Sequence, residues 1–161
     1  MKSITILIAS QGKNAELGNK IKQVAEKSFK CELIDLIDLR LPMYSESEEE
    51  KGIPEKAEKL SKKLVESDSL IFIAPEYNGS IPPSLNNAIC WISRSGKNWR
   101  EAFNGKTTLN FSLPVTVAIA NSLPQRSPTN THVVDIGISL SSLKKNNMIQ
   151  YTASMIVALL T

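Results

Sequence analysis

The chain has 161 residues, 42% of them hydrophobic and 22% charged, and its formal net charge is +3. This length predicts one domain over residues 1–161, and the mild charge, carried by lysines spread along helical patterns, argues against a nucleic-acid partner. With only two cysteines and one histidine, the chain cannot form a disulfide framework or a Cys/His zinc site. The absence of a leader-like or membrane-spanning run predicts a cytoplasmic protein with no membrane partner.

Strands and helices alternate along the first two thirds of the chain. Short apolar runs predict strands at residues 3–9, 31–37, 69–74 and 107–111. Helical spacing of apolar residues predicts helices at residues 15–28, after Pro54 (buried face Ala57, Leu60, Leu64, Val65) and after Pro83 (buried face Leu85, Ala88, Ile89, Ile92). The acidic run Glu46–Glu50 is expected to be solvated and mobile. This alternation predicts an α/β fold with a doubly wound parallel sheet.

Two loops of this fold are candidates for a ligand site. In doubly wound sheets of order 2-1-3-4-5, ligands bind at the carboxyl edge where the strand order reverses, between strands 1 and 3. The first loop at this edge, residues 10–14, supplies a hydroxyl, amides and one cation just before a helix. Free helix N–H groups make such a loop suitable for a phosphate, although serine and asparagine are also common helix caps. The candidate residues are Ser10, Gln11, Lys13 and Asn14.

The second loop, residues 75–81, suits a planar ligand. Tyr77 can present an aromatic face, Gly79 permits a close approach, and Asn78 and Ser80 offer hydrogen bonds. A phosphate on one loop and a ring on the other describe a mononucleotide, flavin included. The alternative is that this segment only turns the chain into the next helix, with a proline at its first position. No P-loop, dinucleotide fingerprint or nucleophile elbow occurs, so no catalytic side chain is predicted.

The second loop also carries a resemblance to a known family. Residues 75–82, Pro-Glu-Tyr-Asn-Gly-Ser-Ile-Pro, resemble the NADPH-dependent FMN reductase family of flavodoxin-like proteins. The resemblance extends over residues 1 to about 111. It includes the first loop together with Asp35-Leu36, Leu41-Pro42, Gly52-Ile53-Pro54, Leu85, Asn87, Ala88, Ile89, Trp91, Ile92, Ser93 and Arg94.

The resemblance implies a three-layer flavodoxin-like sheet of order 2-1-3-4-5 in a homodimer or homotetramer. It implies non-covalent FMN, hydride from NAD(P)H, and a quinone, azo, metal or flavin electron acceptor. The flavin carries that chemistry, so no general base or nucleophile is needed. The resemblance implies that Ser10, Lys13 and Asn14 hold the phosphate, and that the isoalloxazine ring is bordered by Pro75, Glu76, Tyr77, Asn78 and Gly79.

The C-terminal third departs from the family pattern. The glycine-rich loop that the family usually places after the fourth strand is absent from residues 112–121. One interpretation is a frameshift near residue 113, since codons read one base earlier permit Gly-Asn-Gly-Gly-Asn-Arg-Lys-Phe in place of residues 115–122. The other is a divergent but functional tail, with strands at Val115–Ile119 and Val133–Leu140 and a helix at Ile149–Leu160.

Three functions follow from these observations. The first is an NAD(P)H-dependent FMN oxidoreductase. The second is a flavodoxin-type electron carrier, but such carriers are usually strongly acidic and the net charge of +3 argues against it. The third is an inactive product with a disrupted C-terminus. A yellow purified protein that oxidises NADPH would support the first function, and a yellow one that does not would support the second. A colourless, aggregation-prone protein would support the third.

Overall fold

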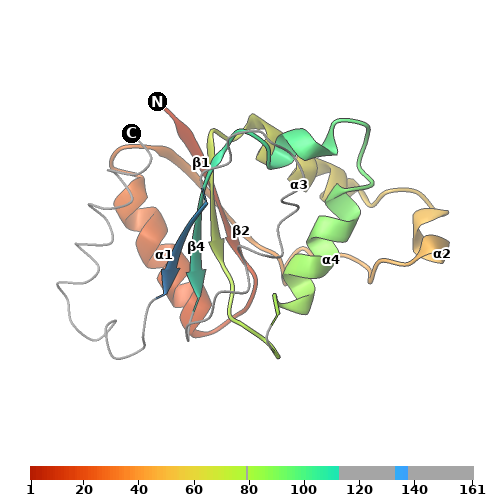
Figure 1. Cartoon of the computed structure of the whole chain (residues 1–161), viewed down its shortest axis with the longest axis horizontal. Coiled ribbons are helices and arrows are strands. Elements are labelled where there is room, and N and C mark those ends of the chain that lie inside the picture. Colours follow the sequence, from red (N-terminus) through yellow and green to blue (C-terminus); the bar gives the residue numbers. More distant parts are fainter. Residues whose placement is uncertain (79, 113–132, 138–161) are drawn as a thin grey trace.

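The computed structural model describes residues 1–78, 80–112 and 133–137 (Figure 1). The strands are β1 (Ser3–Ile8), β2 (Lys30–Asp35), β3 (Ser69–Ile73), β4 (Thr107–Ser112) and β5 (Val133–Gly137). The helices are α1 (Lys13–Ala25), α2 (Glu46–Glu49), α3 (Glu55–Glu66), α4 (Pro83–Ile92) and the 3-10 helix η1 (Trp99–Ala102).

The five strands form one parallel sheet in the order β2-β1-β3-β4-β5. This confirms the predicted topology. The strand that the divergent-tail interpretation places at Val133–Leu140 is confirmed over Val133–Gly137. The strand predicted at Val115–Ile119 and the helix predicted at Ile149–Leu160 lie outside the described residues.

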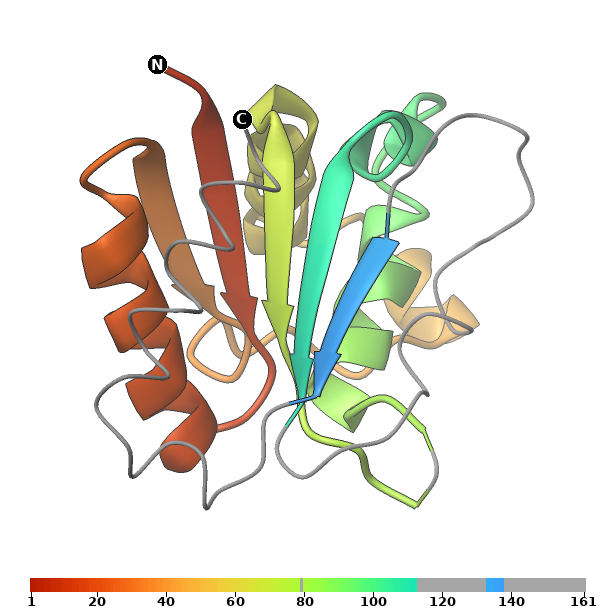
Figure 2. The ribbon, with the colours of Figure 1, turned by 60° about the vertical axis from the view of Figure 1, so that its left-hand side comes forward.

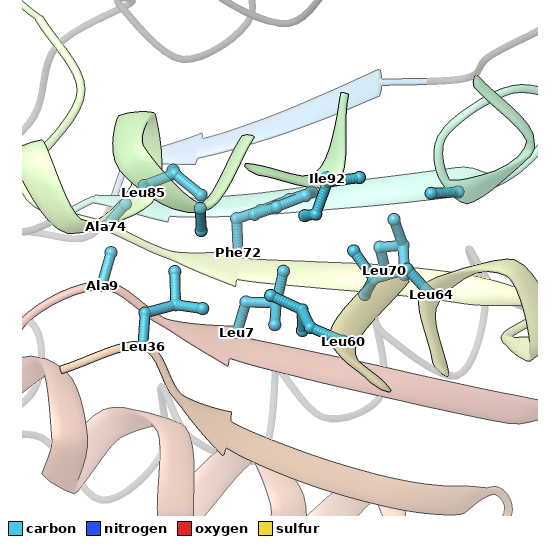
Figure 3. Close-up of a cluster of buried hydrophobic side chains, with 12 residues drawn as sticks. Leu7, Ala9, Leu36, Leu60, Leu64, Leu70, Phe72, Ala74, Leu85 and Ile92 are labelled. Carbon is cyan, nitrogen blue, oxygen red and sulfur yellow. The ribbon is translucent and has the colours of Figure 1, made fainter. Parts of the chain in front are cut away.

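Helices cover both faces of the sheet, with α1 on one side and α3 and α4 on the other (Figure 1). Because successive side chains of a strand point to opposite faces, Ile4 and Ile6 of β1 pack with α1, whereas Leu7 packs with α3 and α4. Figure 3 shows the second of these layers around Leu7, Phe72 and neighbouring leucines. The two layers fix β1 and β3 at the centre of the molecule.

Gly18 lets α1 lie close against the sheet. A Cβ atom at this position would lie 2.6 Å from Ile8 Cδ1 and 2.9 Å from Ile8 Cγ1. Those atoms belong to a fully buried side chain, so a larger residue here would push α1 away from β1. The position of α1 matters because its N-terminus adjoins the first loop.

The structure differs from the prediction in three details. Val65 is 37% exposed, because it follows the inward-facing Leu64 by one residue and therefore points away from the sheet. Ile89 is only partly buried, while Trp91 is completely buried. The acidic run is partly helical, as α2. Its cap is Ser45, whose Oγ accepts from the Glu48 N–H at 3.2 Å, in the Ser-x-x-Glu pattern of a capping box.

Candidate functional site

The two predicted loops lie at the same edge of the sheet, because β1 and β3 are parallel neighbours (Figure 2). The first loop (residues 10–14) follows β1, and the second loop (residues 75–81) follows β3. Past the end of β1, the Ala9 N–H donates to the Ile73 carbonyl at 2.9 Å. The Ala9 carbonyl accepts a hydrogen bond from Ser84 Oγ of α4 at 2.6 Å. The topology therefore brings together the residues that the sequence placed at the switch point.

A buried polar pair forms the base of the first loop. Ser10 and Asn14 are 8% and 7% exposed, and Asn14 Nδ2 donates to Ser10 Oγ at 2.8 Å. Asn14 Oδ1 is buried and has no hydrogen-bond partner among the described residues. A 180° rotation of the amide would keep the bond to Ser10, now with the hydroxyl as donor, and leave an N–H unpartnered instead. The pair can therefore offer a donor to a bound anion.

The backbone of the first loop adds further donors. The first hydrogen bond of α1 runs from the Glu16 N–H to the Gly12 carbonyl at 3.0 Å. Within the described part of the chain, no carbonyl accepts from the N–H groups of residues 10–15. Gly12 has a φ of 68°, which favours glycine at this turn. Free N–H groups at a helix N-terminus and a buried amide lacking a partner together fit a phosphate group.

The two other candidates of this loop, Gln11 and Lys13, are exposed. Lys13 Nζ lies 2.9 Å from Glu16 Oε2 and 3.1 Å from Oε1. The hydrogen bond from Lys13, helped by its charge, lowers the pKa of the Glu16 carboxyl. Lys13 therefore has a competing carboxylate within its own helical turn, which the sequence interpretation did not consider.

The second loop is a tight turn. The Tyr77 N–H donates to the Ser80 carbonyl at 2.9 Å, and the Ser80 N–H donates back to the Tyr77 carbonyl at 3.0 Å. Asn78 has a φ of 53°, as in the Asn-Gly turns of hairpins. The sequence interpretation treated Asn78 as a side-chain donor and missed this backbone role, although the Asn-Gly dipeptide is a known turn signal.

The side chains of the second loop differ in their exposure to solvent. Pro75 is buried, Glu76 is half-buried, and Asn78 and Ser80 are exposed, while Gly79 lies outside the described residues. Tyr77 is 48% exposed. The predicted helix start is confirmed, because Pro83 occupies the first position of α4. The segment thus turns the chain into α4 and also exposes the aromatic side chain of Tyr77 at the edge of the sheet.

A hydrogen-bonded contact joins α4 to the segment after β2. The Pro42 carbonyl accepts from Asn87 Nδ2 at 3.0 Å and from Trp91 Nε1 at 2.7 Å. The Tyr44 N–H donates to Asn87 Oδ1 at 2.8 Å, and the Tyr44 ring packs edge-on against Trp91 at 5.3 Å. Pro42 belongs to one part of the family resemblance and Asn87 and Trp91 to another, and the structure shows that the two parts contact one another.

The same contact continues onto α2. Tyr44 OH donates to Glu49 Oε2 at 2.6 Å and accepts from Arg94 Nε at 3.1 Å. The hydrogen bond to Glu49 raises the pKa of the Tyr44 hydroxyl, and the bond from Arg94 opposes that change. Sequence reasoning missed this contact because its partners are up to 50 residues apart.

A groove of about 460 Å³ lies elsewhere, between β2 and α3. None of the nine candidate residues that the structure describes lines it. Its walls carry carboxylates from β2 and the following segment, and lysines from α3, over an apolar floor. The lining residues are Glu32, Leu33, Ile34, Asp35, Asp38, Leu39, Lys56, Lys59, Leu60 and Lys63.

Two other kinds of site are absent from the part of the chain that the structure describes. Its cysteine and acidic side chains do not gather into a group that could hold a metal ion. None of its helices has the length and apolar character needed to cross a membrane.

The chain is similar to a known family and to several known proteins. The family model for NADPH-dependent FMN reductase matches residues 2–128. The chain belongs to this family. A quinone reductase of Pseudomonas putida is 30% identical over 109 residues, 66% of this chain and 56% of the relative. The MG342 homolog of Mycoplasma pneumoniae, an uncharacterized protein, is 36% identical over 96 residues, 58% of this chain and 57% of the relative.

Solved structures of flavoenzymes share the fold of this FMN reductase family member. FerB, an NAD(P)H:acceptor oxidoreductase from Paracoccus denitrificans, superposes with a TM-score of 0.71 at 21% identity, over 99% of this chain and 97% of that one. The curated relatives are matched over little more than half of their own length. The comparisons thus establish the family and the fold.

Proposed function

We propose that this protein is an NAD(P)H-dependent FMN oxidoreductase that binds the flavin between its two loops. The observation that carries the proposal is Asn14, a buried amide at the start of α1. Among the described residues, one of its polar atoms and the neighbouring backbone N–H groups have no partner. A buried polar group without a partner is costly, so such a group indicates a ligand that satisfies it. The neighbouring exposed Tyr77 supports a planar ligand.

Each loop has a distinct role in this proposal. Ser10, Asn14 and the N–H groups of the first loop hold the phosphate, and Lys13 neutralises it after leaving Glu16. Pro75, Glu76, Tyr77, Asn78 and Gly79 border the ring, with Gln11 and Ser80 at the margins. The flavin supplies the hydride chemistry when bound, so the protein binds and orients it without a catalytic side chain.

We propose a quinone as the electron acceptor, because relatives are named quinone reductases. Azo compounds, metal ions and free flavin are the competing acceptors. Steady-state NADPH and NADH oxidation with each class of acceptor tests the proposal. A flavin-bound protein that does not oxidise either nicotinamide would favour the electron carrier instead.

We further propose that the protein assembles as a homodimer or homotetramer. α4 has no charged residue, whereas the neighbouring surface helix α3 is rich in lysine and glutamate. An uncharged surface helix is typical of a covered face. Light scattering on the purified protein tests this, and a monomer at micromolar concentration would contradict it. The cytoplasmic location also stays a prediction.

Residues 1–161 are proposed to form one FMN-binding domain. The two interpretations of residues 113–161 differ in their genetic prediction. Resequencing the gene across the codons for residues 112–121 separates them, because an unbroken frame identical to the present one would overturn the frameshift. If resequencing instead reveals the frameshift, restoring the alternative frame is expected to increase the affinity of the protein for flavin.

A further inference from the structure

Ser84, in the first turn of α4, links the helix that follows the second loop to the residue that precedes the first loop. Its Oγ donates to the Ala9 carbonyl at 2.6 Å, across 75 residues of sequence. Ala9 is 2% exposed and packs in the same apolar layer as Leu85, the residue after Ser84 (Figure 3). The Ala9 N–H is held in turn by the Ile73 carbonyl of β3. Ala9 is therefore fixed from β3 on one side and from α4 on the other.

The Ala9 carbonyl shares a peptide plane with the Ser10 N–H. The two groups of a trans peptide point in opposite directions. Holding the carbonyl toward Ser84 therefore directs the Ser10 N–H away from α4. That N–H has no carbonyl partner among the described residues, and the Ser10 side chain bonds to Asn14. Ser84 thus controls the orientation of the first donor of the first loop.

We propose that Ser84 is a positioning residue for the flavin phosphate. This inference rests on the proposed function. Ser84 does not hold the phosphate itself; it orients the Ser10 peptide and, through Ser10, the Ser10–Asn14 pair. The competing explanation is that Ser84 only satisfies a buried carbonyl and so stabilises the fold. The two explanations differ in which ligand they affect, because riboflavin has the ring but lacks the phosphate.

The test compares FMN and riboflavin binding to the full chain by flavin fluorescence. For Ser84→Ala we expect the Kd for FMN to rise about tenfold, the effect of one net hydrogen bond. The Kd for riboflavin should stay within about twofold of the wild type. The Ser84→Thr variant keeps a hydroxyl and should retain FMN affinity. The Ser84→Val variant has the shape of threonine but no hydroxyl, and should lose that affinity.

Ser93→Ala is the matched control. Ser93 Oγ donates to the Cys90 carbonyl at 2.7 Å at the other end of α4, so its loss should leave FMN binding unchanged. Equal weakening of FMN and riboflavin by Ser84→Ala, or no weakening of either, would overturn the positioning role alone. A wild-type protein that binds neither flavin would overturn the proposed function and this inference with it.

Discussion

Asn14 Nδ2 lies 2.8 Å from Ser10 Oγ, and the other polar atom of the Asn14 amide is buried without a partner in the described part of the chain. The two residues belong to the first turn of α1 and to the segment just before it. With the amide rotated by 180° and the Ser10 hydroxyl as donor, the atom left over is an N–H donor, which a phosphate can accept.

The first prediction concerns Asn14 itself. Asn14→Ala should weaken FMN binding by about 10- to 100-fold, because a hydrogen bond to a charged group is lost. Asn14→Asp keeps the shape but adds a negative charge beside the phosphate, so it should weaken binding further at pH 7. Isothermal titration with FMN and riboflavin measures both. Equal affinity of all three proteins for FMN would show that Asn14 does not contact the phosphate.

The second prediction concerns the ion pair of Lys13 and Glu16. Glu16→Gln removes the carboxylate that competes for Lys13, so FMN binding should tighten by about two- to fivefold at low salt. The gain should fade as the salt concentration rises. Lys13→Gln should weaken FMN binding instead. Weaker binding by Glu16→Gln would contradict the assigned competition.

The third prediction is a pH effect at Cys31 on β2. Burial, followed by the charge of Glu26, raises the pKa of the Cys31 thiol from 9.0 to about 11. At pH 8 its thiolate fraction should therefore be about 100-fold lower than that of a free cysteine. In a Cys90→Ser variant, labelling by a thiol reagent should be slow in the folded protein and fast in denaturant, with the folded rate increasing up to about pH 11. Equal rates in the two states would refute the partial burial of Cys31.

The pKa of Cys31 also fixes the sign of its effect on stability. A thiol whose pKa is raised by folding binds its proton more tightly in the folded state. Its contribution to stability is thus complete below pH 9 and decreases as the pH rises toward about 11. In denaturation curves recorded between pH 9 and about pH 11, the Cys31→Ala variant should lose less stability than the wild type.

The fourth prediction concerns the contact between α4 and the segment after β2. Trp91→Phe removes the hydrogen bond to the Pro42 carbonyl from a fully buried position, and should lower the free energy of unfolding by about 1–3 kcal/mol. Tyr44→Phe should cost less, because Tyr44 and Glu49 are only partly buried and Arg94 is exposed. Urea denaturation measures both. A larger effect for Tyr44 than for Trp91 would contradict this ranking.

The sheet could be predicted because its strands are short apolar runs separated by helices with one apolar face. Proline at the start of α4 and the period of Leu60 and Leu64 in α3 were sufficient to place those helices. Val65 was misassigned because its apolar side chain is adjacent in sequence to a buried position. The α2 helix was missed because four glutamates resemble a solvated loop, although Ser45 and Glu48 form a capping pattern.

The candidate site was predictable in its location but not in its details. Strand order alone places the two loops at one edge. The hydrogen bond of Ser84 joins residues 75 positions apart, so it emerged only from the three-dimensional structure. The ion pair of Lys13 with Glu16 and the turn at Asn78 are local, and the spacing of three residues and the Asn-Gly dipeptide are sequence signals that the interpretation did not use.

The most direct test of the account is FMN binding followed by reduction with NADPH. The purified protein is titrated with FMN, and the flavin absorbance near 450 nm is then followed without oxygen as NADPH is added. The account predicts one FMN per chain and loss of that absorbance with one NADPH per FMN. A protein that binds no FMN, or whose bound FMN is not reduced by NADPH or NADH, would contradict it.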